Sequence, residues 1–372
     1  MKNPVAALVK LTAMLLVALI PTSHLIAAAE RDTDGSLSED SEPKNSESAS
    51  KVAYEEVRSV RKTVERAIPY LEHAGEAWIE KRQCVSCHQV PFMLWSLSAA
   101  DAQGYTINRS RLKKWTGWST EVRNFVKPAQ KQDQEAASTL AANIDTLNFL
   151  LLGLPATTQA VTDGTSAQAE TNAGRISAAW RKTFVKALVE NQHDQGAWTP
   201  CGQLPAQKRP VEETTQVTTA WTLLALNSHH ATAEREQQAL ASLQNTNPVS
   251  TEWWAVHLLL AEKRRDMNPD ALCTALIEKQ QPDGGWGWLT SDPSDALATG
   301  IAIYALSCHD ADQNKAAISR AVAYLISSQT SDGSWKVPGT KKTTRNKPTP
   351  TSSYWGTAWA VLGLLRIESR DR

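Results

Sequence analysis

Two kinds of hydrophobic pattern alternate along the second half of the chain. Blocks that end in Gln, such as "ISAAWRKTFVKALVENQ" and "AAISRAVAYLISSQ", place apolar residues at helical spacing with charged residues between them, which predicts amphipathic helices. Blocks that begin with Thr, such as "TAWTLLAL" and "TAWAVLGL", are apolar on nearly all sides, which predicts buried helices. We therefore expect outer and inner helices in an all-α fold, with each threonine a possible helix cap.

Short repeated loops join the two kinds of block. The segments "QHDQGAW" (192–198), "QQPDGGW" (280–286) and "QTSDGSW" (329–335) align without gaps, each with Gln, Gly four residues later and Trp six residues later. Glycine supplies the positive φ of a helix stop and tight turn. These loops are therefore predicted to end one helix and lead to the next.

The alternation predicts helical hairpins that bury their apolar faces against their neighbours. Six pairs are expected. The outer helices are predicted near residues 52–81, 108–127, 174–191, 232–245, 268–280 and 314–328, and the inner helices near 89–101, 143–154, 215–227, 249–262, 295–308 and 353–366. Six hairpins can close into an α/α toroid with a central cavity, and an open solenoid is the alternative.

The Gln-x-x-x-Gly-x-Trp loops followed by Thr-x-Trp helices resemble the prenyltransferase and squalene oxidase repeats of squalene-hopene cyclases and related α6/α6 toroids. The resemblance covers residues 174–366 well, and residues 52–155 only through the hairpin pattern. It implies a terpenoid cyclase-like toroid. It also implies that a repeated set of residues ties adjacent hairpins together: Gln192, Trp198, Gln280, Trp286, Gln329 and Trp335.

The chemistry of that family is not reproduced. Squalene-hopene cyclases protonate an alkene with the central aspartate of Asp-x-Asp-Asp, but the nearest match is "DPSD", with Ser294 at the central position. Serine is not a strong acid, so we expect Asp292 and Asp295 to cap a helix start. Some toroid enzymes bind zinc through one Cys and a Cys-His pair, and the only counterpart of that pair outside the C-x-x-C-H motif is Cys308 and His309. We expect these two to be a packed cysteine beside a surface histidine.

The start of the chain predicts export. Lys2 and Lys10 precede the apolar run "LTAMLLVALI", and Ala27 and Ala29 form an A-x-A site, so residues 1–29 are expected to be a signal peptide cleaved after Ala29. A retained membrane anchor is the alternative. Residues 30–50 are rich in Ser, Asp and Glu and are predicted to be a disordered linker before the toroid domain, 51–372. No later segment is apolar enough to span a membrane, which predicts a periplasmic protein.

Charge and cysteine content narrow the functional classes. The chain has 39 Lys and Arg against 39 Asp and Glu, and this balance argues against a nucleic-acid binder. Its five cysteines, at positions 84, 87, 201, 273 and 308, are too few and too scattered for a disulfide framework. The first two therefore need their own explanation.

The stretch "RQCVSCHQVPFMLW" holds Cys84, Cys87 and His88 in the C-x-x-C-H spacing of haem attachment in c-type cytochromes. Two thiols at this spacing can each add to one haem vinyl group, and the adjacent imidazole is then the proximal ligand of the iron. Attachment by cytochrome c maturation machinery occurs on the exported side, in agreement with the signal peptide. The motif joins the helices of the first hairpin, so a covalent haem c is predicted at the cavity mouth. The expected role is electron transfer with a redox partner, haem-dependent catalysis or sensing.

Other interpretations stay open. The same three residues could hold zinc with Cys201 or His193 as a further ligand, in a zinc-dependent or cyclase-like toroid enzyme. A disulfide or thiol pair is another possibility, and a third functional class is a binding module that takes a small molecule in the central cavity without chemistry. The sixth iron ligand is equally open: His193 is the preferred candidate, and a free position for water or a small ligand is compatible with the sequence.

Met93 and His257 are two further residues of a type that can bind haem iron. Met93 is too near His88 in sequence to reach the opposite face of the same haem. His257 lies within a predicted inner helix, where it either lines the cavity or is a satisfied core histidine.

A basic loop occurs in the last hairpin, which would close the ring beside the first. Its five cationic residues are Lys336, Lys341, Lys342, Arg345 and Lys347. They are expected to form a flexible solvated loop, and neutralisation of haem propionates or attraction of an anionic partner is the alternative.

Overall fold

In the computed structural model of the chain, the described residues are 44–85, 88–126, 135–154, 172–202, 204–244, 247–310, 312–344 and 347–368. The chain divides into the units Met1–Ser48 and Ala49–Arg372. The expected signal peptide, its cleavage site after Ala29 and most of the expected linker lie outside the described residues. Helix α1 begins at Lys44, before the predicted start of the first outer helix.

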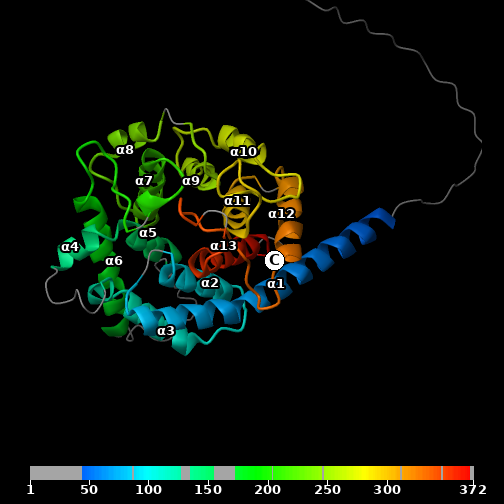
Figure 1. Cartoon of the computed structure of the whole chain (residues 1–372), viewed down its shortest axis with the longest axis horizontal. Coiled ribbons are helices and arrows are strands. Elements are labelled where there is room, and N and C mark those ends of the chain that lie inside the picture. The colour runs from blue at the N-terminus through cyan, green and yellow to red at the C-terminus, as the bar shows by residue number, and fades with distance from the viewer. Residues whose placement is uncertain are drawn as a thin grey trace, which may run out of the picture. The chain divides into compact units, whose positions relative to one another are not determined.

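Twelve of the described helices form two concentric layers (Figure 1). The inner layer consists of α2 (Val90–Ala102), α5 (Ile144–Gly153), α7 (Val211–Ser228), α9 (Thr251–Ala261), α11 (Ala296–Cys308) and α13 (Pro350–Glu368). The outer layer consists of α1 (Lys44–Arg82), α3 (Arg109–Ser119), α6 (Asn172–Glu190), α8 (Glu236–Ser242), α10 (Pro269–Ile277) and α12 (Lys315–Ser328). Every predicted outer and inner helix is present. The short helix α4 (Ala136–Ala141) and the 3-10 turns η1 (Val122–Asn124) and η3 (Leu204–Ala206) were not predicted.

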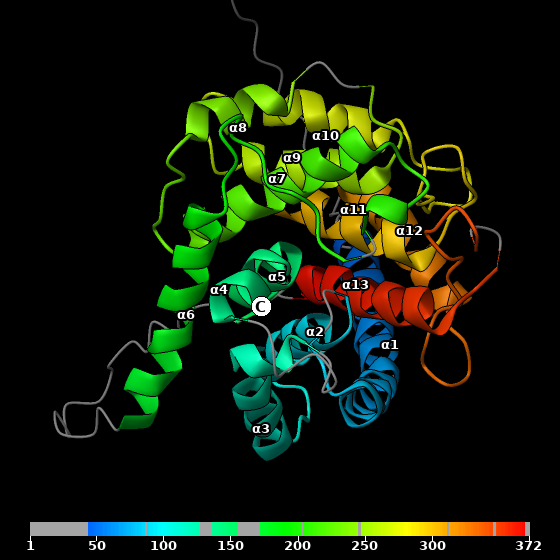
Figure 2. The same ribbon diagram turned by 60° about the vertical axis from the view of Figure 1, so that its left-hand side comes forward.

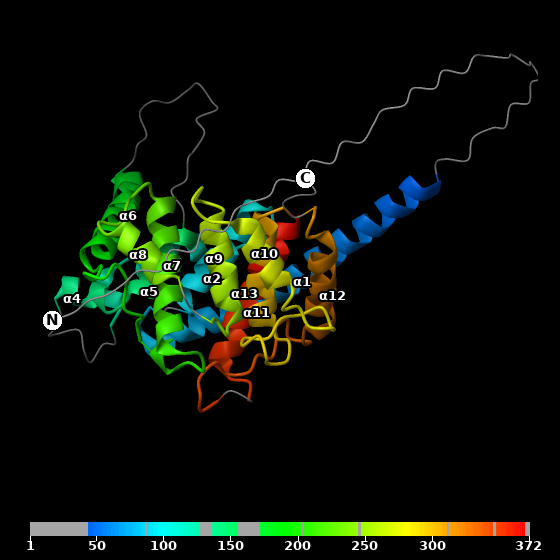
Figure 3. The same ribbon diagram turned by 90° about the horizontal axis from the view of Figure 1, so that it is seen from above.

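The inner helices form a closed ring. Each inner helix contacts the next one along the chain, in the order α2, α5, α7, α9, α11 and α13. The last of them, α13, packs against α2. Figure 2 shows α13 lying beside α2. Figure 3 shows neighbouring helices such as α7, α9 and α10 side by side around the ring. The α/α toroid is therefore confirmed, and the open solenoid is wrong.

The repeated Gln and Trp residues hold neighbouring hairpins together, as the resemblance implied. The Nε2 atoms of Gln192, Gln280 and Gln329 donate to the carbonyl oxygens of Arg235, Ala317 and Thr63, each on the next hairpin around the ring. The indole nitrogens of Trp198, Trp286 and Trp335 donate to Leu188, Leu276 and Leu325 of the preceding outer helix. Each loop is thus bonded to its own helix and to its neighbour.

The threonines of the inner blocks are not helix caps, contrary to the prediction. The hydroxyls of Thr219, Thr299 and Thr357 accept a hydrogen bond from the backbone nitrogens of Trp198, Trp286 and Trp335. The caps are other residues: Ser250 accepts from the Trp253 amide at the start of α9, and Asp295 accepts from the Ala298 amide at the start of α11. The threonines therefore bind the loop that precedes their helix.

Aromatic side chains from the inner helices fill part of the ring interior. Phe92 of α2 lies 4.8 Å from Phe149 of α5 between ring centroids, and 5.2 Å from Trp359 of α13. Trp221 of α7 packs against both Phe149 and Trp359, at 5.6 and 5.9 Å. Because this cluster packs across the interior, the open space lies towards the loops.

None of the helices in the described ranges combines the length and apolar character needed to cross a bilayer.

Candidate functional site

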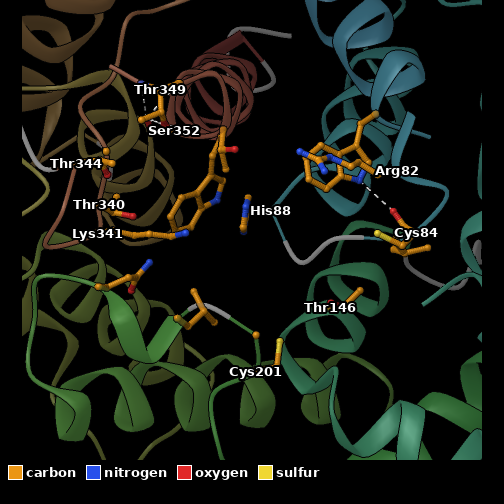
Figure 4. A pocket seen from close by; sticks show the side chains of 18 of the residues that line it. Arg82, Cys84, His88, Thr146, Cys201, Thr340, Lys341, Thr344, Thr349 and Ser352 are labelled. Carbon is orange, nitrogen blue, oxygen red and sulfur yellow. Dashed lines mark hydrogen bonds between the residues drawn. The ribbon is translucent and has the colours of Figure 1, made fainter. Parts of the chain in front are cut away.

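A cavity of about 490 Å³ opens among the loops at one end of the ring (Figure 4). Its walls come from five places: the end of α1, the C-x-x-C-H segment, the start of α5, the loop before α7, and the loop before α13 together with the first turns of that helix. The volume falls within the range of ~300–1,000 Å³ found for small-molecule sites. The predicted cavity at the toroid mouth is therefore present.

Described residues of the C-x-x-C-H segment form part of one wall of this cavity. Cys84 and His88 both line it, and Ser86 and Cys87 lie outside the described residues. The segment is held by backbone contacts, since the Trp78 indole donates to the Cys84 carbonyl oxygen at 3.0 Å and the Val85 amide donates to the Asn124 carbonyl oxygen at 2.6 Å. Cys84 and Val85 are therefore held between α1 and η1.

His88 lines both the cavity and a small crevice next to it. Its ring centroid is 5.8 Å from that of Trp355, and both residues line the cavity and the crevice. Asp145, Arg209 and Glu252 line the deeper part of the crevice. The imidazole thus stands between an open, ligand-sized space and a buried polar layer.

Cys201 lines the same cavity as Cys84 and His88, as it would have to do in the zinc interpretation. Its backbone amide donates to Asp145 Oδ2 at 2.8 Å, and the Thr218 hydroxyl donates to Asp145 Oδ1 at 2.8 Å. Asp145 therefore fixes the Cys201 loop to α5 and α7. Within the part of the chain that the structure describes, no three His, Cys, Asp or Glu residues are grouped so that they could hold a metal ion.

His193, the preferred sixth iron ligand, is not among the residues that line the cavity. It is exposed in the third hairpin's loop, and its Nε2 lies 2.7 Å from the Thr199 hydroxyl. Met93 is buried in α2, where it packs against Gly75 of α1. Neither His193 nor Met93 lines the cavity that His88 lines.

His257 is a core histidine and does not line the cavity. Its Nδ1 lies 2.7 Å from the Trp253 carbonyl oxygen, and its ring stacks on Trp253 with centroids 3.7 Å apart. Burial lowers the pKa of His257 to about 4, against the hydrogen bond to Trp253. It is therefore neutral at ordinary pH.

The "DPSD" segment has a structural role. Asp295 caps α11, as predicted, and also accepts a hydrogen bond from the Trp288 amide at 2.8 Å. Burial raises the pKa of its carboxyl to about 6. Asp292 is not a cap, because its carboxylate pairs with Lys208 at 2.6 Å. Ser294 donates to Asp283 Oδ1 at 2.6 Å.

The second Cys-His pair also lies apart from the cavity. Cys308 ends α11, and the following His309 is held between two carboxylates, with Nδ1 2.6 Å from Glu262 and Nε2 3.1 Å from Asp270. The expectation of a surface histidine is wrong, because these contacts leave only 13% of its side chain exposed.

One residue of the basic loop reaches the cavity. Lys341 lines it, and Figure 4 shows its side chain extending in the direction of His88. Lys336, Lys342 and Lys347 are not among the lining residues, and Arg345 lies outside the described ones.

The loop that carries Lys341 is bonded to the loop before α7. The Lys208 amide donates to the Thr340 carbonyl oxygen at 2.9 Å, and Gln207 forms an isolated antiparallel bridge with Lys341. Backbone contacts therefore tie this part of the loop to the loop before α7.

Several cavity and crevice residues were missed from the sequence. Arg209 and Glu252 form an ion pair of 2.8 Å with side chains only 1% and 3% exposed, and Glu252 also accepts from the Trp221 indole at 3.0 Å. A signal for Glu252 was present, since it is an acidic residue in the otherwise apolar inner block "TEWWAVHL". Thr146 and Gln207 carried no such signal.

The toroid has counterparts among solved structures. A possible member of the GH105 family from Salmonella enterica has a TM-score of 0.52 and 13% identity, over 84% of this chain and 94% of that one. A type II terpene cyclase from Scytonema, in complex with geranylgeranyl dihydroxybenzoate, has a TM-score of 0.51 and 12% identity, over 85% and 99%. No protein-family model matches the chain, and no curated protein is significantly similar in sequence. The chain thus has the α/α toroid fold shared by hydrolase-type and cyclase-type proteins.

Proposed function

We propose that the chain carries one covalently attached haem c at the mouth of the toroid cavity and acts in electron transfer, haem-dependent catalysis or sensing. The observation that carries the proposal is the position of Cys84 and His88 in a C-x-x-C-H sequence on one wall of a cavity of about 490 Å³. A haem attached there would lie at the cavity and not on an open surface.

The residues around the motif suit such a group. Trp78, Val85, Leu204 and Trp355 give the cavity apolar and aromatic surface for a flat macrocycle. Hydroxyl and cationic side chains line the cavity as well, including Lys341, which suits carboxylate substituents. This division into apolar and polar surface supports haem over a bare thiol pair.

Each residue has a defined part in the proposal. The Cys84 and Cys87 thiols form thioether bonds, and His88 supplies the proximal nitrogen. Trp78 and Asn124 hold the segment through its backbone. The bound group supplies one-electron redox chemistry at iron. The exposed position of His193 and its contact with Thr199 favour a sixth position left for a small molecule that enters the cavity.

Production of the exported chain with a cytochrome c maturation system tests the proposal. The expected result is a coloured protein with a c-type visible spectrum and one haem-sized increase in intact mass. Cys87→Ser and Cys84→Ser should each abolish a normal two-thioether attachment. Cys273→Ser is the matched control, because Cys273 is buried in the outer helix α10 and its thiol contacts Asn314 at 3.3 Å. A colourless protein of unmodified mass would refute haem attachment.

A zinc site is the second candidate. It is favoured by the position of Cys201, which lines the same cavity as Cys84 and His88. The ligands would be Cys84, Cys87, His88 and Cys201, a set typical of zinc. Cys84, His88 and Cys201 would have to move closer together to bind the ion, since these described residues are not grouped for a metal in the structure. Cys201→Ser separates the two functions: it should abolish zinc measured by elemental analysis and leave covalent haem attachment intact. Zinc at one equivalent in colourless wild-type protein, lost in this variant, would favour the second candidate.

Export is part of the proposal, because haem c is attached outside the cytoplasm. Cell fractionation of the native chain should place it in the periplasm, with a mature form that lacks residues 1–29. A redox partner would then be an exported or membrane-facing protein. Recovery of the uncleaved chain in the membrane fraction would support the retained anchor instead.

A further inference from the structure

The cavity has a wall whose chemistry differs from that of the motif wall. It is formed by Gln207, by Gly339, Thr340, Lys341 and Thr344, and by the first turns of α13, which carry Trp355. Thr340, Thr344, Thr351 and Ser352 add hydroxyl groups to it. We call this surface the Lys341 wall.

The charge of the cavity is one-sided. Arg82 and Lys341 line it, and no carboxylate does so among its described lining residues. The Arg82 guanidinium lies 5.4 Å from the ring of Trp78 on the motif side, so the two cations belong to different walls. An enclosed space with cations and no lining anion attracts a negatively charged group.

Three buried polar atoms at the cavity have no hydrogen-bond partner among the described residues. They are the Thr146 hydroxyl, the Gln207 carbonyl oxygen Oε1 and the Trp355 indole nitrogen Nε1. The three residues are 1%, 3% and 4% exposed, and all of them line the cavity. A buried polar group without a partner destabilises the folded protein. Their shared position therefore indicates that a polar ligand group completes them.

The Lys341 wall is built from segments that are held in place. The Lys208 amide donates to Thr340 at 2.9 Å, the Gly339 amide donates to Lys347 at 2.9 Å, and the Ser352 hydroxyl donates to Val337 at 2.7 Å. Gln207 and Lys341 face each other in an antiparallel bridge. Because the backbone is fixed on both sides, the polar atoms are positioned before any ligand arrives.

We propose that the Lys341 wall is a carboxylate-binding subsite. The Lys341 ammonium and the Trp355 indole N–H would bind the carboxylate oxygens, and Gln207 would bind a polar group beside it, while the Thr146 hydroxyl lies across the cavity on α5. Charge-assisted bonds of this type are stronger than neutral ones. The carboxylate has two possible sources: a propionate of the attached haem, in which case the inference rests on the proposed function, or a free small carboxylate.

Free carboxylate binding is measured on chain produced without haem maturation. Sodium propionate is the probe and propionamide its neutral analogue, and the readout is the indole ¹⁵N–¹H signal of Trp355, assigned by its loss in Trp355→Phe. Propionate should shift this signal and propionamide should not. Lys341→Gln should weaken binding ~10-fold or more, whereas Lys336→Gln should not change it, since Lys336 lies outside the cavity. Circular dichroism checks that each variant is folded.

The haem source is measured on the matured protein. If a propionate occupies the subsite, Lys341→Gln should keep the haem-sized mass but lower the midpoint reduction potential, because loss of a nearby cation favours ferric iron. The Trp355 signal should also stop responding to added propionate. Lys336→Gln should leave the potential unchanged.

The two hypotheses fail separately. A chain that never takes up haem contradicts the proposed function, and the propionate titration still decides the subsite. If the folded Lys341→Gln variant changes neither the propionate titration nor the reduction potential, the proposal of a carboxylate-binding subsite is wrong.

Discussion

The side-chain nitrogen Nε2 of Gln329 lies 2.9 Å from the carbonyl oxygen of Thr63, a residue 266 positions earlier in the chain. The same nitrogen donates to the Gly333 carbonyl oxygen at 2.9 Å. Since Thr63 belongs to α1 and Gln329 follows α12, this amide joins the last outer helix to the first. It closes the outer layer in the same way that α13 closes the inner one.

Gln329→Ala should open this closure. The substitution removes both hydrogen bonds and with them the tie between the loop and α1, so the free energy of unfolding should fall by about 1–3 kcal/mol. Urea denaturation followed by circular dichroism measures this. Gln313→Ala is the control, because Gln313 is exposed and its replacement should change stability by less than about 0.5 kcal/mol. Equal effects of the two substitutions would contradict a closing role for Gln329.

Gly333→Ala separates backbone conformation from close packing. Gly333 has φ of +81°, and an added Cβ would lie 2.0 Å from the Arg66 carbonyl oxygen of α1. Gly104 has a similar φ of +77° with nothing within 4 Å of an added Cβ. Gly104→Ala should therefore cost about 1 kcal/mol from φ alone, and Gly333→Ala clearly more, as measured by melting temperature. A smaller effect at Gly333 would show that α1 and the loop separate easily.

Glu252→Gln should be among the most destabilising conservative substitutions in the ring. It leaves the buried Arg209 guanidinium without its carboxylate partner, at an expected cost of about 3–5 kcal/mol. Glu190→Gln is the matched control, since the Lys186–Glu190 pair has side chains 72% and 59% exposed, and exposed pairs contribute about 0–1 kcal/mol. Chemical denaturation of both variants at one pH decides the comparison, and a cost at Glu252 no larger than at Glu190 would contradict it.

His257 should make the chain less stable in mild acid. Its folded pKa of about 4 lies below the unfolded value of about 6.5, so between these values the unfolded chain binds more protons. The stability that depends on neutral His257 is complete above about pH 6.5 and is lost as the pH falls towards 4, by about 2 kcal/mol between pH 7 and pH 5. His257→Phe keeps a stacking ring on Trp253 and should reduce this loss. Unfolding curves at several pH values test it, and an unchanged pH dependence in the variant would assign the effect to other groups.

The helices could be predicted because their signal is local. The apolar spacing of blocks such as "AAISRAVAYLISSQ" directly reflects which side of α12 is buried. The ties made by Gln192, Gln280 and Gln329 were also accessible, because three aligned loops repeat the same residues at the same spacing. The threonines were misread since a position near the start of a block does not tell whether the hydroxyl bonds its own helix or the preceding loop.

The cavity could be predicted only in part. The C-x-x-C-H motif is a local signal, and its place between two predicted helices located it at the mouth. The opposite wall is assembled from the loop of Gln207 and the loop of Lys341, which lie far apart in sequence and share no pattern. Nothing in the spacing indicated that Lys341, rather than its basic neighbours, lines the cavity, or that His193 does not.

The contact between α13 and α2 also constrains the order in which the fold can form. Helix α2 belongs to the first hairpin, but one of its two inner neighbours is the last helix of the ring. During synthesis α2 must therefore wait for nearly all of the described chain before it is enclosed, and this long-range pairing is expected to be a late and slow step of folding. The loop that holds Cys84 and His88 directly precedes α2, so we expect it to stay accessible to a modifying enzyme until this late step of folding.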